Sequence, residues 1–300
     1  MPEIRSWLAR TTEASVAEMR AILDAGDILV PVREAGRRVP LVSDDLPAGS
    51  VIIRTSGSTG HPRDIVLPGA AFRASAAATI ERLDLRASDV WWASLAPAHV
   101  GGLTLLLRAA QVGCGVAFTD GFDAATFWRL CAERRITHAS MVPTMLRRVL
   151  EAAPADADPS SLRTVLIGGA ASDPALLKQA TEVGIPVAVT WGMTETCSQL
   201  STAVPAETAA DPTHSGRLLP DVELRPDAVG RLSVRTPTMS LGELVDGVLV
   251  PLVDEEGWFA TDDLGEVDSE GFVRINGRVS DRIISGGVNV DPLAIERERE

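Results

Sequence analysis

The chain has 300 residues, a mass of 31.7 kDa and a formal net charge of −13, since 28 basic side chains stand against 41 acidic ones. This length suggests about two domains and an ample core. Nucleic acids and anionic membranes are bound by basic surfaces, so a chain this acidic is a poor candidate for either partner. Apolar residues make up 45% and charged residues 23%, which is ordinary for a globular protein and argues against intrinsic disorder.

The cysteines and the first residues bear on redox state and targeting. Cys114, Cys131 and Cys197 are widely spaced and form no CxxC pair, which disfavours a disulfide framework and a cysteine zinc site. The first residues lack the apolar core of a signal peptide. Residues 90–107 carry no formal charge, but Pro97 and two glycines interrupt them, which favours a strand, a loop and a helix over a membrane span. We therefore expect a soluble, cytoplasmic protein without membrane insertion.

A regular alternation of strands and helices is predicted from residue 51 onward. Before it, apolar residues at helical spacing predict a helix at 16–23, and residues 37–49 are expected to form a loop. The predicted strands lie at residues 51–53, 90–94, 116–118, 138–142, 164–167 and 186–190. The helical stretches between them lie at residues 70–83, 103–110, 124–133, 144–152 and 174–183. This alternation predicts an α/β fold with a mainly parallel sheet and helices on both faces.

The pattern changes beyond about residue 215, where prolines and glycines separate short alternating runs that are typical of a β-rich subdomain. The predicted organisation is an amino-terminal helix and loop at residues 1–48, an α/β region at 49–215, the β-rich subdomain at 216–278 and a final segment at 279–300. In that segment, Asp291 and Pro292 read as the start of a helix that meets the end of the sequence at Glu300. We expect that the chain is cut where a further domain begins.

The densest chemical signal directly follows the strand that begins at Val51: Thr55-Ser56-Gly57-Ser58-Thr59-Gly60-His61-Pro62-Arg63. Glycines let backbone N–H groups approach phosphate oxygens, hydroxyls donate further hydrogen bonds and Arg63 supplies a positive charge. The run is not a Walker A loop, because Pro62 stands where that pattern has its second glycine. A flexible linker is the alternative, but linkers seldom lie between a buried strand and a helix. The run therefore predicts a loop that wraps phosphate.

Three further motifs come at the ends of predicted strands, namely Thr190-Trp191-Gly192-Met193-Thr194-Glu195, Gly168-Gly169-Ala170-Ala171 and Ala96-Pro97-Ala98-His99-Val100-Gly101-Gly102. Trp191 offers a flat face to an adenine ring, and Glu195 offers an oxygen ligand to Mg²⁺. The small residues of the second motif let a base edge approach the backbone, and His99 can contact a ligand. Taken singly, the motifs are also compatible with a strand-to-helix turn, a tight turn and a structural histidine. Together they gather at the carboxyl edge of the sheet, where open α/β sheets bind ligands.

Two motifs lie in the β-rich part. Residues 259–265 contain the paired carboxylates of Asp262 and Asp263, which suit ribose hydroxyls, and residues 277–290 combine cations with a glycine turn. Each is also compatible with an exposed β-turn. The sequence contains no GxSxG, HExxH or GxGxxG motif, and Cys197 has no histidine base near it in sequence, so it is interpreted as a packed thiol.

Taken in order, these motifs resemble those of the adenylate-forming enzymes, which include acyl-CoA synthetases, nonribosomal adenylation domains and firefly luciferase. The resemblance runs from about residue 49 to residue 297 and implies the layered, parallel-sheet amino-terminal domain of that family, with a β-rich subdomain near its end. Within the family, the run Trp191-Gly192-Met193-Thr194-Glu195-Thr196-Cys197-Ser198-Gln199 and the short amino-terminal region are similar to those of o-succinylbenzoate–CoA ligases of menaquinone biosynthesis.

The resemblance implies a role for each matching residue. Phosphate binding falls to Thr55, Ser56, Gly57, Ser58, Thr59 and Gly60. The catalytic residues are Arg63, Thr194 and Glu195, of which Glu195 is also the Mg²⁺ ligand. Nucleotide binding falls to Gly168, Gly169, Ala170, Trp191, Gly192, Met193, Asp263 and Arg278. The acid substrate is contacted by His99, Gly101, Gly102 and Ser198, and the hinge lies at Ser280 and Asp281.

The implied activity is that of a ligase that uses ATP, Mg²⁺ and CoA to adenylate an aryl carboxylate and form its CoA thioester. The sequence departs from the family in three ways. Arg63 replaces the usual lysine, Trp191 replaces the usual tyrosine, and the small carboxyl-terminal domain that supplies the adenylation lysine is absent, so a weakly active chain is expected. A ligase for another aryl or acyl acid and a non-catalytic nucleotide-binding module remain alternatives, and a homodimer remains open.

Overall fold

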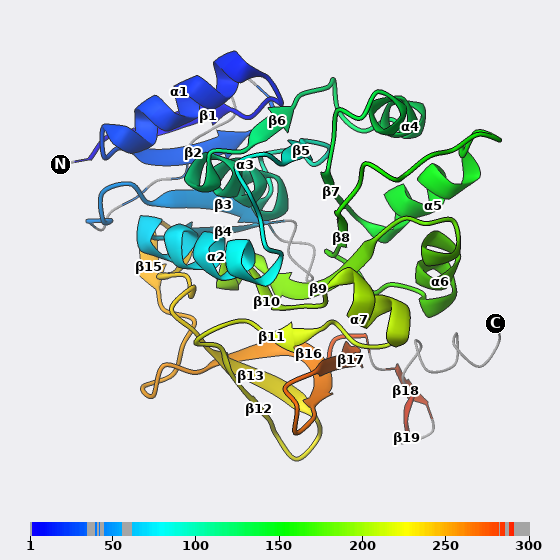
Figure 1. Cartoon of the computed structure of the whole chain (residues 1–300). Helices are drawn as coiled ribbons and strands as arrows, with labels where there is room; N and C mark the ends of the chain where they lie inside the picture. Colours follow the sequence, from blue (N-terminus) through cyan, green and yellow to red (C-terminus); the bar gives the residue numbers. More distant parts are fainter. Residues whose placement is uncertain are drawn as a thin grey trace.

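The computed structural model describes residues 2–34, 40, 42, 45–55, 62–281, 283–285 and 288–290. A six-stranded sheet forms one side of the molecule in Figure 1. Its strands, in spatial order, are β1 (Ile4–Leu8), β2 (Ile28–Val32), β3 (Val51–Thr55), β4 (Arg63–Leu67), β14 (Gly242–Val245) and β15 (Val248–Val250). The strands β1 to β3 are parallel, and β4 and the β14–β15 hairpin continue the sheet in antiparallel fashion.

A seven-stranded sheet forms the centre. In spatial order it contains β11 (Arg217–Leu218), β10 (Ser198–Thr202), β9 (Val187–Met193), β8 (Thr164–Ile167), β7 (His138–Met141), β5 (Val90–Trp92) and β6 (Gly115–Ala117). Strands β5 to β9 pair in parallel, whereas β10 and β11 are antiparallel. The central strands are covered on both faces, and for this reason all four residues of β7 and of β8 are buried.

The helices fill the space between the two sheets and cover the far face of the central one (Figure 1). They are α1 (Glu13–Asp24), α2 (Gly69–Arg82), α3 (Val100–Val112), α4 (Ala124–Ala132), α5 (Pro143–Glu151), α6 (Pro174–Glu182) and α7 (Pro205–Ala210). Apolar residues of α1, α2 and α3 form one buried cluster with Trp7 of the first sheet and Trp91 of the second. Those of α4, α5 and α6 pack on the other face of the central sheet around Trp92. Helices therefore cover both faces of the central sheet, as the sequence predicts.

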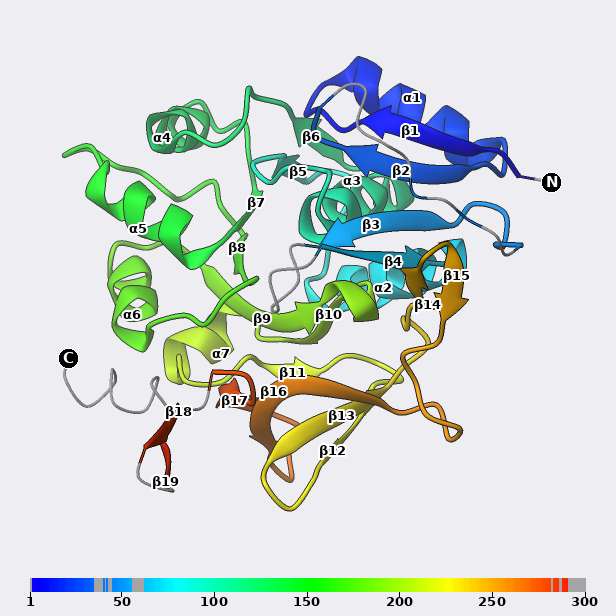
Figure 2. The ribbon, with the colours of Figure 1, turned by 180° about the vertical axis from the view of Figure 1, so that it is seen from behind.

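A four-stranded antiparallel sheet lies beneath the two larger ones in Figure 1. It contains β12 (Glu223–Pro226), β13 (Arg231–Arg235), β16 (Phe259–Val267) and β17 (Val273–Arg278), and β18 (Ile283–Ser285) pairs with β19 (Val288–Val290) as a separate hairpin. The inner face of the four-stranded sheet packs on β9 through a cluster that includes Trp191, Leu232 and Val273. The predicted β-rich part is confirmed, but β14 and β15 leave it and join the six-stranded sheet beside β4 (Figure 2).

One local expectation and one alternative interpretation differ from the structure. Residues 1–48 contain two strands, β1 and β2, where only a helix and a loop were expected, because each strand is completed by pairing with another rather than by a strong local pattern. A strand-to-helix turn is not formed after β9. The strand continues through Met193, and the 3-10 turn Thr194–Thr196 leads straight into β10. The predicted terminal helix at residues 291–300 lies outside the described residues.

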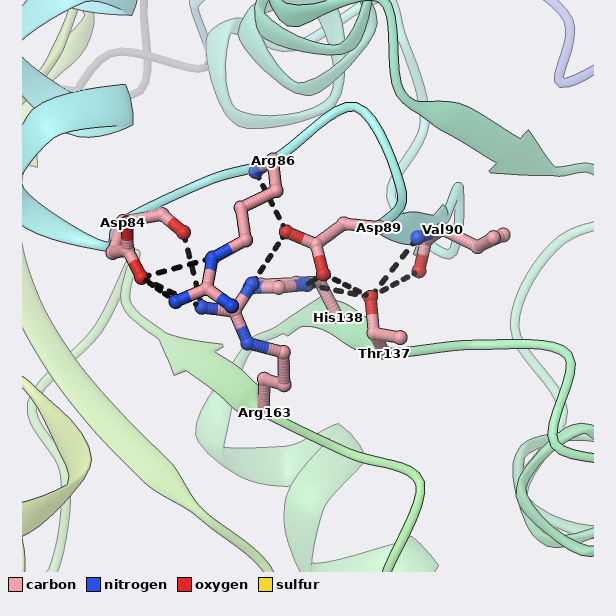
Figure 3. Close-up of polar contacts among 7 residues, drawn as sticks. All are labelled: Asp84, Arg86, Asp89, Val90, Thr137, His138 and Arg163. Carbon is pink, nitrogen blue, oxygen red and sulfur yellow. Dashed lines mark hydrogen bonds and ion pairs between the residues drawn. The ribbon is translucent and has the colours of Figure 1, made fainter.

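A polar network closes the amino ends of β5, β7 and β8, opposite the edge that carries the motifs (Figure 3). The Asp89 carboxylate accepts hydrogen bonds from Arg163 Nη1 at 2.6 Å and Thr137 Oγ1 at 3.2 Å, and Thr137 Oγ1 lies 2.8 Å from Nδ1 of the fully buried His138. Burial lowers the pKa of His138 to about 4, with Arg163 opposing its protonation and Asp89 favouring it. The network also accepts hydrogen bonds from the backbone N–H groups of Arg86 and Val90, which gives it a structural role. Among the helices of the described ranges, none is long and apolar enough to cross a membrane.

Candidate active site

The hairpin of β9, the 3-10 turn and β10 is the centre of the candidate site. Its side chains reach three surrounding parts of the fold: Trp191 contacts the four-stranded sheet, Glu195 contacts β4, and Ser198 contacts α3. Gly192 is required by this hairpin, since a Cβ there would lie 1.8 Å from the Ser198 carbonyl oxygen.

The backbone of this hairpin is strained. Cys197 and Ser198 have φ values of 53° and 92°, which only glycine adopts without cost, and such residues cost on the order of 1–3 kcal/mol each. Ser75 Oγ of α2 donates a hydrogen bond of 2.8 Å to the Cys197 carbonyl and holds the turn in place. Burial raises the pKa of the Cys197 thiol, so this side chain is an inert packed group, as predicted. Strain held in place by packing is typical of a functional turn.

Arg63 and Glu195 form the first contact between two predicted site residues. Arg63 Nη1 lies 2.8 Å from Glu195 Oε1, and Arg63 Nε lies 2.7 Å from Glu243 Oε2. Desolvation opposes the charge on Arg63, but the bond to Glu243 and the field of both carboxylates outweigh it and raise the pKa of Arg63. Glu243 is a member of this cluster that the sequence patterns did not reveal, because it lies 180 residues away along the chain.

Glu195, which is paired with Arg63 in this structure, could supply one carboxylate ligand to a magnesium ion carried by a nucleotide. Among the described residues, no group of three or more His, Cys, Asp or Glu side chains could hold a metal ion by itself. Mg²⁺ is commonly bound through one or two carboxylates, with water and phosphate oxygens completing its shell. The Glu195 carboxylate, with 13% of the side chain exposed, is compatible with such a position.

Asp263 connects the central sheet to the four-stranded sheet. Its Oδ2 accepts a hydrogen bond of 2.8 Å from Trp191 Nε1, and its Oδ1 accepts one of 3.1 Å from Arg278 Nε. Asp263 on β16 and Arg278 on β17 are register partners, so strand pairing brings the predicted ribose-binding residues together. Trp191 is 7% exposed and most of its ring packs among apolar side chains of the core. Its indole N–H donates a hydrogen bond to Asp263.

Arg108 is a second candidate site residue that the sequence patterns missed. Its side chain is 1% exposed, Nη2 lies 3.3 Å from Ser198 Oγ, and Nε has no hydrogen-bond partner among the residues that the structure describes. Burial lowers the pKa of Arg108 to about 10. A charged residue within the apolar run of α3 is the sequence signal that could have identified it, since buried arginines are rare without a partner.

The N-cap and first turn of α3, which follow β5 in the chain, contain His99, Gly101 and Gly102. Gly102 is required for packing, because a Cβ there would lie 2.4 Å from the Ala96 carbonyl oxygen. His99 is exposed at the N-cap of α3, and Arg33 Nη2 donates a hydrogen bond to its ring. Partial desolvation and the charge of Arg33 lower the pKa of His99.

The remaining predicted residues lie at strand ends or outside the described ranges. Gly168 and Gly169 follow β8, and a Cβ on Gly168 would lie 2.6 Å from Cγ2 of Thr190, so β8 and β9 approach closely there. Ala170 follows these glycines. Thr55 and Arg63 are paired across β3 and β4 and hold together the two ends of the predicted phosphate loop. The loop residues Ser56, Gly57, Ser58, Thr59 and Gly60 lie outside the described residues. At the predicted hinge, Ser280 binds Asp262 through its backbone N–H and its hydroxyl, and Asp281 follows.

These contacts and the parallel central sheet define the class of α/β proteins that bind ligands at the carboxyl ends of their parallel strands. The family model of AMP-binding enzymes matches residues 9–244, and the chain belongs to this family. The 2-succinylbenzoate–CoA ligases of Bacillus cereus and Enterococcus faecalis are 36% identical over 260 residues and 33% identical over 264 residues, respectively. Each alignment covers 84% of this chain and 54% of the relative, so the chain spans about half the length of these relatives.

Solved structures show the same similarity. An Escherichia coli MenE variant with bound OSB-AMS matches with a TM-score of 0.82 and 28% identity, over 99% of this chain and 72% of that one. The o-succinylbenzoate coenzyme A synthetase of Bacillus subtilis in complex with ATP and magnesium matches with a TM-score of 0.73 and 25% identity, over 95% of this chain and 66% of that one. The predicted resemblance to adenylate-forming enzymes is confirmed, and with it the layered α/β fold.

Proposed function

We propose that the chain carries the ATP- and acid-binding residues of an AMP-forming acid–thiol ligase, and that its acid is o-succinylbenzoate. The observation that carries the choice of acid is the buried Arg108. Its guanidinium lies beside Ser198, which follows the turn that contains Glu195. A buried cation without a carboxylate partner needs an anion to compensate its desolvation. o-Succinylbenzoate has two carboxylates, so one can pair with Arg108 while the other reacts. The named relatives act on this acid, which supports the same choice.

The proposed reaction has two steps. The reacting carboxylate oxygen attacks the α-phosphorus of ATP, the bond from this phosphorus to the bridging oxygen breaks, and pyrophosphate leaves with the electron pair. The CoA thiolate then attacks the acyl carbon of the mixed anhydride, and AMP leaves as the thioester forms. The site contributes mainly orientation and charge stabilisation to the first step.

The described residues divide this work between them. Arg63, Thr55 and the adjoining loop would hold the phosphates, and Asp263 with Arg278 would bind the ribose, with Trp191 beside them. Glu195 would be the protein ligand of Mg²⁺, which would neutralise charge on the phosphate oxygens. Ser198 and Arg108 would face the acid, with His99, Gly101 and Gly102 at its edge. Thr194 would stand beside Glu195 at the phosphates, and Gly168, Gly169, Ala170, Gly192 and Met193 would line the base. Ser280 and Asp281 would act as a hinge.

A melting experiment with non-hydrolysable acyl-adenylate analogues tests the proposal without requiring turnover. Three analogues would be compared, carrying o-succinylbenzoyl, benzoyl and octanoyl groups. A ligand at a hundredfold excess over its dissociation constant adds about 2.7 kcal/mol to the free energy of unfolding, which corresponds to a melting shift of several degrees at most. We expect the largest shift with the o-succinylbenzoyl compound. Equal shifts would support adenylate binding and contradict the choice of acid, and no shift with any compound would contradict the ligase.

A further inference from the structure

Arg63 lies between two carboxylates that come from distant parts of the chain. Its Nη1 contacts Glu195 of the hairpin turn at 2.8 Å, and its Nε contacts Glu243 of β14 at 2.7 Å. The three side chains are 30%, 13% and 21% exposed, respectively, so none is fully buried and none is freely solvated. The guanidinium therefore uses two different edges for two different partners.

Residues 240–243 hold both partners of this arrangement in place. The Ser240 N–H donates a hydrogen bond of 2.8 Å to the Glu195 carbonyl, and the Leu241 N–H donates one of 2.8 Å to the Val66 carbonyl of β4. Glu243 is then set opposite Ile65 in the antiparallel pair of β14 with β4, which Figure 2 shows side by side. One short segment thus fixes the backbone of Glu195 and places a carboxylate on Arg63.

The glycine that precedes Glu243 is needed for this placement. Gly242 has a φ of +153°, and a Cβ on it would lie 2.3 Å from the Val250 carbonyl oxygen of β15. Any other residue would push the β14–β15 hairpin apart and displace Glu243 from β4. The backbone geometry of the β14–β15 hairpin therefore determines where the Glu243 side chain lies relative to β4.

An arginine is required to use both carboxylates in this way. The guanidinium is a rigid planar fork whose Nε and Nη atoms point in different directions, whereas a lysine ammonium is a single point of charge. Arg63 can keep one contact while it exchanges the other. Glu195 and an incoming phosphate would compete for Nη1, but neither competes for Nε.

We propose that Glu243 is a positioning residue for Arg63: it holds the guanidinium through Nε while Nη1 passes from Glu195 to the phosphates of ATP. This inference rests on the proposed function. We call the contact between Glu243 and Arg63 Nε the tether. It lowers the conformational-entropy cost of ordering the Arg63 side chain when the nucleotide binds, because Arg63 loses one partner and stays in position. It also leaves the Glu195 carboxylate free once Nη1 has moved.

The test measures the dissociation constants of ATP, in the presence of Mg²⁺, and of adenosine by calorimetry, with Glu243→Ala and Glu243→Gln variants of this chain. Glutamine retains an oxygen that can accept from Arg63 Nε but removes the charge. We expect Glu243→Ala to weaken ATP binding about tenfold, Glu243→Gln to stay within about threefold of the original chain, and adenosine binding to be unchanged in both. The matched control is Glu223→Ala, which removes the Arg235–Glu223 ion pair on the four-stranded sheet and should change neither constant.

The remaining outcomes overturn the tether. Tighter ATP binding in both Glu243 variants would mean that the carboxylate merely repels the phosphates. Equal losses for ATP and adenosine would mean a general effect on folding, and a glutamine as damaging as alanine would exclude the hydrogen-bonded tether. In an Arg63→Lys background, the tether predicts no further loss from Glu243→Ala.

The two proposals fail in different ways. If the original chain binds neither ATP nor adenosine, the proposed function itself fails. If it binds both and Glu243→Ala binds them equally well, the ligase proposal stands and the tether alone is wrong.

Discussion

Nη2 of Arg108 lies 3.3 Å from Oγ of Ser198, where the middle of α3 meets the strained start of β10. Arg108 as a whole residue is 1% exposed and forms no ion pair within the described part of the chain, and burial lowers its pKa to about 10. An arginine in this position remains protonated at neutral pH and keeps an unsatisfied positive charge. Its desolvation destabilises the free protein, and a bound anion can compensate it.

Replacing Arg108 with methionine should separate binding from stability. Methionine fills similar space without a buried charge, so we expect the free energy of unfolding without ligand to stay level or rise by about 1–3 kcal/mol. The melting shift from the o-succinylbenzoyl adenylate analogue should fall to that of the benzoyl analogue, which has no second carboxylate. Arg108→Lys, which keeps the charge, should retain part of the difference. A methionine variant that still distinguishes the two analogues would remove Arg108 from the acid site.

Glu195→Gln should abolish the effect of Mg²⁺ on ATP binding. Only the carboxylate is a strong Mg²⁺ ligand, and an amide oxygen at the same place is a weak one. The original chain should bind ATP more tightly with Mg²⁺ than with a chelator, whereas the variant should show nearly equal dissociation constants in the two buffers. Glu266→Gln, at an exposed position of β16, is the charge-matched control and should keep the Mg²⁺ effect. If the Mg²⁺ effect on ATP binding persists in the Glu195→Gln variant, the metal ligand is another residue.

Asp263→Ala should weaken ATP binding through the ribose. Hydrogen bonds to a charged group contribute roughly 1.5–3 kcal/mol each, so a loss of 10- to 100-fold in affinity is expected. The loss should be much smaller for 2′,3′-dideoxy-ATP, which lacks the hydroxyls that Asp263 would accept from. The comparison of the two nucleotides controls for damage to the contacts with Trp191 and Arg278. Equal losses would argue for a structural role of the carboxylate.

The buried His138 should make the protein sensitive to acid. Its pKa is lowered from 6.5 to about 4 by burial, so the unfolded chain binds a proton between these values that the folded chain does not. Stability contributed by neutral His138 is therefore present above pH 6.5 and is lost as the pH falls towards 4. At pH 5 the loss relative to neutral pH should be about 2 kcal/mol.

Urea unfolding at pH 7.5 and pH 5, with the original chain and a His138→Gln variant, checks this expectation. The variant should lose about 2 kcal/mol less than the original chain between the two pH values. His214, whose pKa is also lowered by burial, is present in both proteins and contributes equally. An identical loss in both proteins would show that His138 is not the responsible group.

Many candidate site residues could be named from the sequence because they occur in contiguous runs at the ends of predicted strands. Arg63, Glu195 and Ser198 were identified in this way, and the structure places the first two in direct contact. The pairing of Asp263 with Arg278 also has a local cause, since they belong to neighbouring strands of one antiparallel sheet. The predicted boundaries at residues 48, 215 and 278 stay predictions.

The sequence by itself indicated the alternation of strands and helices between residues 90 and 190, the family and the candidate motif residues, because these depend on local periodicity and on short runs of particular side chains. Only the tertiary structure decided that Arg108 lies beside Ser198 and Glu243 beside Arg63, since these partners are 90 and 180 residues apart. It also decided that β14 pairs with β4 in the six-stranded sheet and that the Trp191 indole N–H donates a hydrogen bond to Asp263. Such contacts arise from the packing of sheets and helices against one another, and no local pattern encodes which distant charge will lie at hydrogen-bonding distance.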